Sequence, residues 1–311
     1  MSTLKQSVEI TGKGIHSGAP VTMIVRPSEL HGIFFRRTDL PDSGLIAAKY
    51  DNVGDTTMRN TTIGDMHGAH VQTIEHVMAA LFMAGIDSAI IDIDGPETPI
   101  LDGSAAHFYN VFMSSGVTSG RLSRIIVRRP VIAYASEIRR SLGLFTRTKL
   151  WVSEKISGRK NDGFVKLAPA DDNSLHITAT LVYPEKIIGY QSFSYSFSGD
   201  EKSVTDFVDN IAHARTFGKY SEWEYLKSHG MARGADETNV IALNNNGDGT
   251  LNNLIWPDEF VRHKVIDAIG DMYTSGGWVI GKLESYKGSH ALNNLVLKKL
   301  FSDAANYDII E

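Results

Sequence analysis

The chain has 311 residues, of which 42% are hydrophobic and 22% charged, as in an ordinary soluble globular protein, and it contains no cysteine. Disulfides and cysteine-based zinc sites are therefore excluded. The formal net charge is −5 and no long block of like charge occurs, so the sequence does not indicate a nucleic-acid-binding surface. A transition-metal site must use histidine and carboxylate ligands, and 11 histidines are available for it.

The N-terminus is polar and lacks the apolar core of a signal peptide. No apolar run reaches the ~18 residues that a transmembrane helix needs. We therefore expect a cytoplasmic monomer that touches a membrane peripherally at most.

The first part of the chain combines strand and helix patterns. Residues 5–40 alternate apolar and polar residues between Gly and Pro turns, which predicts short antiparallel strands. Residues 71–85 carry apolar residues at helical spacing and end at Gly85, a typical C-cap residue. A strand is predicted at 88–95, and residues 99–116 predict a turn that leads into a second helix.

The pattern then restarts. Strands are predicted at 124–134, 163–197 and 278–286, and helices at 203–213, 221–228, 258–275 and 289–301. The helix at 258–275 is strongly amphipathic.

A weak internal repeat supports two similar halves. His76 and His263 each lie in a predicted helix that is followed by a glycine turn, an apolar strand and a Gly-Ser pair that starts another helix. The likeness is one of order, not of identity. We expect an α+β protein with domains at 1–124 and 125–311, each with helices packed on one face of a mostly antiparallel sheet.

Two short segments carry candidate metal ligands. His263 and Asp267 are four residues apart, so they share a helix face, and Asp271 lies one turn further along. Taken alone, this pattern fits a surface helix with a His–Asp pair equally well. The Glu75-His76 pair, taken alone, favours a buried or capping histidine.

Combined, these segments have the composition of a catalytic zinc site. His76, His263 and Asp267 supply three N and O ligands, and a water can fill the fourth position. Such a metal lowers the pKa of its water towards ~7 and polarises a carbonyl. Glu75, adjacent to a ligand, can take the water's proton.

Two further residues have candidate roles. His290 follows two small residues at the start of a helix, where it can act as a general acid; an acidic partner such as Asp271 would raise its pKa. Thr216 can donate a hydrogen bond to an oxyanion. The alternatives are a helix-start histidine without a role and an ordinary strand threonine.

These segments together resemble the UDP-3-O-acyl-N-acetylglucosamine deacetylase family of lipid A biosynthesis. The resemblance covers nearly the whole chain in order. The matching stretches are TGKGIHSG (11–18), FFRRTDLP (34–41), NTTIG (60–64), TIEHVMAAL (73–81), GPETPILDGSAA (95–106), ARTFG (214–218), EFVRHKVIDAIGD (259–271) and YKGSHALNN (286–294).

The resemblance implies a two-domain α+β enzyme with its site between the domains. It implies zinc on His76, His263 and Asp267, a ligand set that also suits ferrous iron. The other implied roles are Glu75 as general base, His290 as general acid supported by Asp271, Thr216 on the oxyanion, Lys264 positioning substrate, Phe217 against the sugar or acyl chain, His16 near the metal and Thr62 near the nucleotide-sugar.

The family also has a small β-α-β insert that forms a passage for the substrate's acyl chain. The resemblance places it at about 214–243 in this sequence. An amphipathic helix with an apolar face is the plainer interpretation, and it is compatible with the passage. The candidate lining residues are Tyr220, Trp223, Leu226, Met231 and Ala232.

The sequence departs from the family pattern in several places. Gly288-Ser289 stands where Ser-Gly is usual, Lys219 replaces a usually aromatic residue, and Trp223 is bulky for its position. Residues 136–160, rich in basic residues and serine, are extra relative to the pattern, and we expect an extended hairpin or a loop there.

The resemblance predicts zinc-dependent hydrolysis of the N-acetyl group of UDP-3-O-(3-hydroxyacyl)-N-acetylglucosamine to acetate and a free 2-amine. Two alternatives stay open. One is a zinc amidohydrolase that acts on another N-acyl sugar, and the other is a nucleotide-sugar binding protein whose metal is structural.

Overall fold

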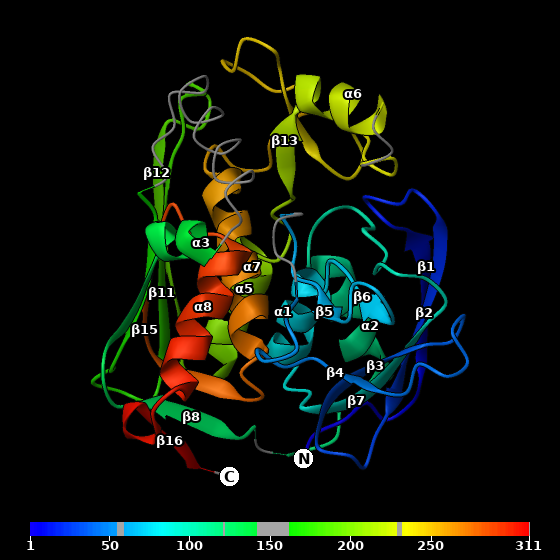
Figure 1. Cartoon of the computed structure of the whole chain (residues 1–311), viewed down its shortest axis with the longest axis vertical. Helices are drawn as coiled ribbons and strands as arrows, with labels where there is room; N and C mark the ends of the chain where they lie inside the picture. Colours follow the sequence, from blue (N-terminus) through cyan, green and yellow to red (C-terminus); the bar gives the residue numbers. More distant parts are fainter. Residues whose placement is uncertain (55–58, 121, 142–161, 229–231, 311) are drawn as a thin grey trace.

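The chain folds into two β-sheets with a layer of helices between them (Figure 1). A computed structural model describes residues 1–54, 59–120, 122–141, 162–228 and 232–310. The first sheet is built from β1 (Val8–Lys13), β2 (Pro20–Pro27), β3 (Gly32–Arg37), β4 (Ile46–Ala47) and β7 (Ser88–Ile93), in the order β1-β2-β7-β3-β4. A separate small pair is formed by β5 (Ile63–Gly64) and β6 (His70–Val71).

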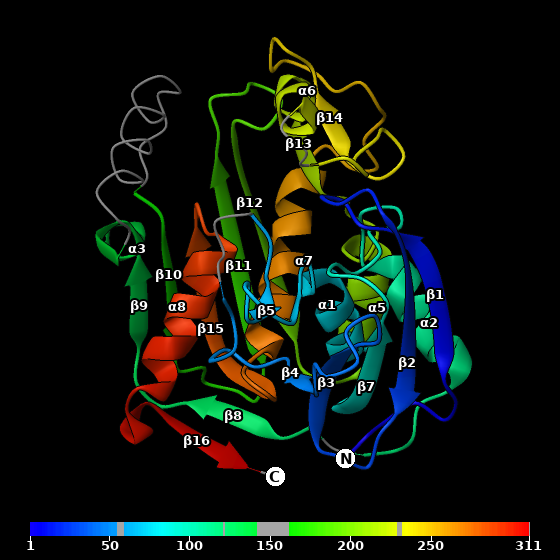
Figure 2. The same ribbon diagram turned by 45° about the vertical axis from the view of Figure 1, so that its right-hand side comes forward.

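The second sheet lies on the other side of the helices (Figures 1 and 2). Its strands are β8 (Arg124–Val127), β9 (Val131–Tyr134), β10 (Phe164–Ala168), β11 (Leu175–Val182), β12 (Tyr190–Phe197), β15 (Trp278–Tyr286) and β16 (Tyr307–Ile310), which follows the short 3-10 helix η1 (Ala304–Asn306). The main order is β12-β11-β15-β10-β9, and β8 joins β15 to β16.

The two sheets repeat one pattern of strand pairing. In the first, β3 pairs antiparallel with β4 and parallel with β7, and β7, β2 and β1 continue antiparallel. In the second, β11 pairs antiparallel with β12 and parallel with β15, and β15, β10 and β9 continue antiparallel. The α+β class predicted from the sequence is confirmed, and the repeat has a structural counterpart.

Equivalent helices flank the strand at the same position of each sheet. Helices α1 (Glu75–Met83) and α2 (Ala106–Ser115) flank β7 in the chain, and α7 (Glu259–Tyr273) and α8 (His290–Phe301) flank β15. Since the first sheet ends with β7 and the second begins with β8, we propose residue 124 as the boundary between two domains.

The helical layer is the hydrophobic centre of the molecule. Every residue of α1 is buried, as is nearly all of α7, and these two helices pack against each other. Helix α1 is almost entirely apolar, as expected for a helix that is covered on all sides, whereas α7 carries several charged residues into this layer. The strands instead alternate: β11 turns every second residue inward and the others outward. Polar residues inside this layer therefore call for a specific reason.

Two further helices and two short strands lie between β12 and α7 in the chain. Helix α5 (Glu201–Asn210) starts at Asp200, whose carboxylate accepts from the backbone N–H of Ser203. Between α5 and α7, β13 (Phe217–Lys219) and β14 (Ile241–Leu243) pair in parallel with α6 (Tyr220–Ser228) between them. Figures 1 and 2 show this β-α-β unit beyond the N-terminal end of α7. The unit falls within residues 214–243, where the resemblance places an insert.

Two predicted elements differ from the structure. Helix α1 begins at Glu75 rather than at residue 71, because His70 and Val71 pair with β5. Residues 136–141, predicted as hairpin or loop, belong to helix α3 (Ala135–Ser141), which is stabilised where Glu137 accepts from the backbone N–H of Tyr134. The remainder of the predicted hairpin, 142–160, lies outside the described residues. None of the described helices has the length and apolar character to cross a membrane.

Candidate metal and catalytic site

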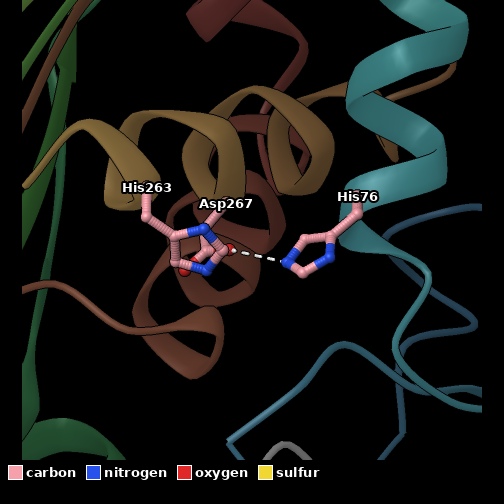
Figure 3. A group of neighbouring side chains, drawn as sticks. All are labelled: His76, His263 and Asp267. Carbon is pink, nitrogen blue, oxygen red and sulfur yellow. Dashed lines mark ion pairs between the residues drawn. The ribbon is translucent and has the colours of Figure 1, made fainter. Parts of the chain in front are cut away.

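Three buried ligand groups converge where α1 meets α7 (Figure 3). His76 comes from the first turn of α1, and His263 and Asp267 come from successive turns of α7. One Asp267 oxygen, Oδ1, lies 3.4 Å from Nε2 of His263 and 3.7 Å from Nε2 of His76. One atom from each residue falls within 4.8 Å of the others, a separation that a single metal ion can bridge.

The surroundings of these groups fit a divalent metal. Asp267 Oδ1 is buried and has no hydrogen-bond partner among the described residues, which is costly for a carboxylate oxygen unless a cation binds it. The ring of His263 donates from Nδ1 to the carbonyl of Ala214 at 3.0 Å, which leaves Nε2 free as a ligand. Two imidazoles and one carboxylate are a common catalytic zinc set, and they also suit ferrous iron.

The charge state of the ligands also suits metal binding. Burial lowers the pKa of His263 to about 3, so its ring is neutral and able to donate a lone pair. Burial alone would raise the pKa of Asp267, but the ammonium of Lys264 outweighs it and holds that pKa well below its usual range. The ammonium of Lys264 donates to Asp267 Oδ2 at 2.6 Å, which orients the carboxylate.

Glu75 lies beside the ligand group with its charge only partly compensated. Its Oε2 accepts from the backbone N–H of Thr61 at 3.0 Å, and its Oε1 lies 3.7 Å from Nε2 of His290. Burial raises the pKa of Glu75 above its usual value. A carboxylate whose pKa is raised is a stronger base than an exposed one, so it is better suited to accept and return a proton.

His290 faces Glu75 across the site and is held by an acidic partner. Its Nδ1 lies 2.8 Å from Oδ2 of Asp271, a carboxylate that also accepts from the side chains of Asn293 and Thr61. Burial lowers the pKa of His290, but the charges of Asp271 and Glu75 outweigh it and raise that pKa to about 10. The ring is therefore protonated at neutral pH, with Nε2 directed towards Glu75.

A cavity of about 360 Å³ opens from the three ligands towards the β-α-β unit. It is bounded by both halves of the chain, so it lies between the two proposed domains. Of the predicted site residues, those that line it are His16, Glu75, His76, Thr216, Phe217, Trp223, Leu226, Ala232, His263, Lys264, Asp267 and His290.

Some predicted residues lie elsewhere. Asp271 stands behind His290 rather than on the cavity. Thr62 is fully buried and donates to Asn60, and Tyr220 packs with Trp223 without lining the cavity. Met231 lies outside the described residues.

The aromatic and basic residues beside the ligands form a connected group. Phe217 packs edge-on against His263, with ring centroids 6.3 Å apart, and the Lys264 ammonium lies 5.6 Å from the centre of the Phe217 ring. Further along the cavity, Lys219 forms an ion pair with the buried carboxylate of Glu185. The unusual lysine is therefore neutralised by a residue that lies far from it in the sequence.

Several residues of the site were missed by the sequence analysis. Thr61 bridges Asp271 and His290 through its hydroxyl and Glu75 through its backbone, and Asn293 donates to Asp271. Both belong to stretches quoted for the resemblance, NTTIG and YKGSHALNN, which was the one available signal. Glu185 lies in no quoted stretch and had no signal.

Comparison with known proteins agrees over the whole chain. The model of the UDP-3-O-acyl N-acetylglycosamine deacetylase (LpxC) family matches residues 1–302. A protein of Nitratiruptor sp. named UDP-3-O-acyl-N-acetylglucosamine deacetylase is 36% identical over 99% of this chain and 93% of its own length. Proteins of the same name from Myxococcus xanthus and Neisseria meningitidis serogroup C are 38% and 32% identical over 99% of this chain and over 88% and 92% of their own lengths.

Matches of this extent identify the chain as an enzyme, a deacetylase that hydrolyses an amide. The resemblance noted in the sequence is confirmed, and a possible metal site of two histidines and one aspartate accompanies it. The chain belongs to the UDP-3-O-acyl N-acetylglycosamine deacetylase family.

Proposed function

We propose that the enzyme removes the N-acetyl group of UDP-3-O-acyl-N-acetylglucosamine in the cytoplasm, as a step of lipid A biosynthesis, with Zn²⁺ held by His76, His263 and Asp267. The main support for a metal is the environment of Asp267 Oδ1. This oxygen is buried between two imidazole nitrogens and has no other partner in the described part of the chain. The substrate follows from the names of the relatives.

The residues around the ligands divide the proton transfers between them. His76, His263 and Asp267 would hold a divalent metal, which would supply polarisation of the amide carbonyl and a lower pKa for the attacking water. Glu75 accepts the proton of that water as its oxygen attacks the carbonyl carbon. His290, protonated and facing the same space, donates a proton to the nitrogen as the C–N bond breaks, so acetate and a free 2-amine leave.

Other groups stabilise charge and orientation. The Thr216 side chain lines the cavity and is placed to donate to the oxyanion, while its backbone N–H donates to the carbonyl of Gly103 at 2.9 Å. Lys264 holds Asp267 and faces the substrate space. Asp271 keeps His290 charged and fixes its ring.

The acyl chain belongs in the β-α-β unit. An apolar cluster there contains Trp223, Ala232 and Val240, with Leu226 packed against it, and the catalytic cavity extends to these residues. Apolar walls of this kind favour a hydrocarbon chain through the hydrophobic effect. His16 and Phe217 line the same cavity, and we assign them contacts with the sugar.

A deacetylase assay tests the proposal. Purified protein is assayed on UDP-3-O-acyl-N-acetylglucosamine with and without a chelator, and acetate release is measured. We expect activity that the chelator abolishes and added Zn²⁺ restores. His263→Ala should lose both the bound metal and the activity; a variant that kept both would refute the ligand assignment.

A control substrate and metal removal address the two alternatives. Equal turnover of a UDP-sugar that lacks the 3-O-acyl chain would favour an amidohydrolase for another N-acyl sugar. Metal loss that unfolds the protein, with no deacetylation under any condition, would favour a binding protein with a structural metal.

A further inference from the structure

A buried carboxylate outside the metal site connects two parts of the cavity wall. Glu97, between β7 and α2, is 2% exposed. It accepts hydrogen bonds from the backbone N–H groups of His16 and Ser17, and from the hydroxyls of Ser17 and Thr73, at 3.0–3.1 Å. All these donors are uncharged, so within the described part of the chain oriented dipoles compensate this carboxylate.

On one side, Glu97 holds the loop 14–18. This loop wraps the carboxylate so closely that a side-chain carbon on Gly14 would lie 2.2 Å from Oε2 of Glu97. The backbone carbonyls of the loop accept from the β-α-β unit. The backbone N–H of Arg233 donates to the carbonyl of His16 at 3.1 Å, and the backbone N–H of Gly234 donates to the carbonyl of Ile15 at 3.0 Å. Glu97 thus fixes the inner side of the loop on which that unit rests.

On the other side, Glu97 holds the turn that leads into α1. Thr73 has a φ of 60°, a left-handed conformation that β-branched residues strongly disfavour. Its hydroxyl donates to Oε1 of Glu97 at 3.0 Å and accepts from the side-chain amide of Asn60 at 3.0 Å. Such strain persists where surrounding contacts enforce it, and it concentrates at functional sites.

The strained turn immediately precedes the reacting groups. Glu75 and His76 are the first two residues of α1, so the path of the chain at Thr73 sets where both side chains begin. Asn60, the other partner of Thr73, is followed by Thr61, whose N–H holds Glu75. One network therefore joins the loop of His16 to the base and to one metal ligand.

We propose that Glu97 is a positioning residue for deacetylation, which sets the start of α1 through Thr73 and the wall of the cavity through His16 and Ser17. The inference rests on the proposed function for its activity readout. The measurement of Zn²⁺ affinity does not depend on that function, because the turn at Thr73 also sets the position of His76.

The substitution Glu97→Gln separates this role from simple packing. Glutamine keeps the volume but replaces one accepting oxygen by an NH₂ donor. Facing the N–H groups of His16 and Ser17, that donor meets two others, so the amide must turn its NH₂ towards Thr73. Thr73 can then no longer donate to this side chain, and the contact of the His16 N–H with Oε1 is lost as well, while Oε2 remains an acceptor for the loop 14–18.

The experiment compares Glu97→Gln, Thr73→Val, the double variant and Thr73→Ser by Zn²⁺ affinity, kcat, KM and thermal midpoint. Loss of a partner that orients a metal site lowers affinity or activity by roughly 10–100-fold. We expect each of the first two to lower Zn²⁺ affinity and kcat within that range, and the double variant to be no worse than the stronger single one. Thr73→Ser, which keeps the hydroxyl, should retain both.

Asp92→Asn is the matched control. Asp92 is another buried carboxylate, 5% exposed, but Arg26 and Arg36 hold it on the outer face of the first sheet. This variant should lower the thermal midpoint and leave Zn²⁺ affinity, kcat and KM unchanged.

Three outcomes would overturn the proposal: Glu97→Gln with wild-type kcat and Zn²⁺ affinity, multiplicative losses in the double variant, or equal losses in Thr73→Ser and Thr73→Val. If Glu97→Gln does not fold, the comparison of Thr73→Ser with Thr73→Val still tests the proposal. If the wild-type enzyme binds Zn²⁺ but does not release acetate, the proposed function fails. The Zn²⁺ affinities of the variants then test the role of Glu97 without the activity.

Discussion

The carbonyl oxygen of Glu75 lies directly against Gly270: a side-chain carbon at position 270 would sit 1.9 Å from it. This contact is where the first turn of α1 crosses α7. It brings His76 to the face of α7 that carries His263 and Asp267, which lie seven and three residues before Gly270 in the same helix. The closeness of two helices from different halves of the chain thus creates the ligand group.

Gly270→Ala should push α1 away from α7. The added methyl meets backbone rather than a flexible side chain, so we expect the free energy of unfolding to fall by about 1–3 kcal/mol or more. We also expect weaker Zn²⁺ binding. Thermal unfolding and zinc titration measure these effects. Gly68→Ala is the control, because its nearest neighbouring atom would lie 3.4 Å away. Unchanged Zn²⁺ affinity in Gly270→Ala would show that the contact does not set the ligand geometry.

Asp271→Asn should move the alkaline limb of the pH–activity profile. The Asp271 carboxylate is the main charge that raises the pKa of His290, and without it only Glu75 and Asp267 oppose the effect of burial, so that pKa falls. The acid form of His290 is then lost at a lower pH, so the fall in kcat at high pH should begin earlier. The profile of kcat from acidic to alkaline pH measures the shift. An alkaline limb that stays in place would mean that another group sets it.

The sequence predicts some parts of this site well because they are local. His263 and Asp267 share a helix face by spacing alone, and the structure places them together. His76 could be joined to them only through the resemblance, since its place depends on how two helices pack. Thr61, Glu97 and Asn293 could not be assigned roles, because their roles depend on loop paths and on partners distant in sequence. The helix predicted from residue 71 starts at Glu75, because Val71 pairs with β5 and Thr73 adopts a left-handed conformation, and both override the apolar periodicity.

Removing the metal should weaken the fold without abolishing it. The layer around α1 and α7 is a continuous hydrophobic core that is independent of the ligand residues. A ligand that binds only the native state stabilises it by mass action, by about 2.7 kcal/mol at a concentration 100 times its Kd. Zn²⁺ should therefore raise the thermal midpoint of the chelated protein, and His263→Ala should show no such rise. Complete unfolding on chelation would contradict the catalytic assignment and favour a structural metal.

Trp223 should limit the length of the acyl chain that the β-α-β unit accepts. Its side chain is 6% exposed, lines the cavity and packs over Gly218, so it fills space that a longer hydrocarbon would need. Trp223→Leu should raise kcat/KM for longer chains relative to shorter ones. Burial of one methylene contributes about 0.8 kcal/mol, which corresponds to about fourfold in kcat/KM for each added carbon that fits. Tyr225→Leu, on the same helix but 63% exposed, should leave the preference unchanged. A series of UDP-sugars that differ only in acyl length measures the ratio, and an identical ratio in Trp223→Leu and wild type would place the acyl chain elsewhere.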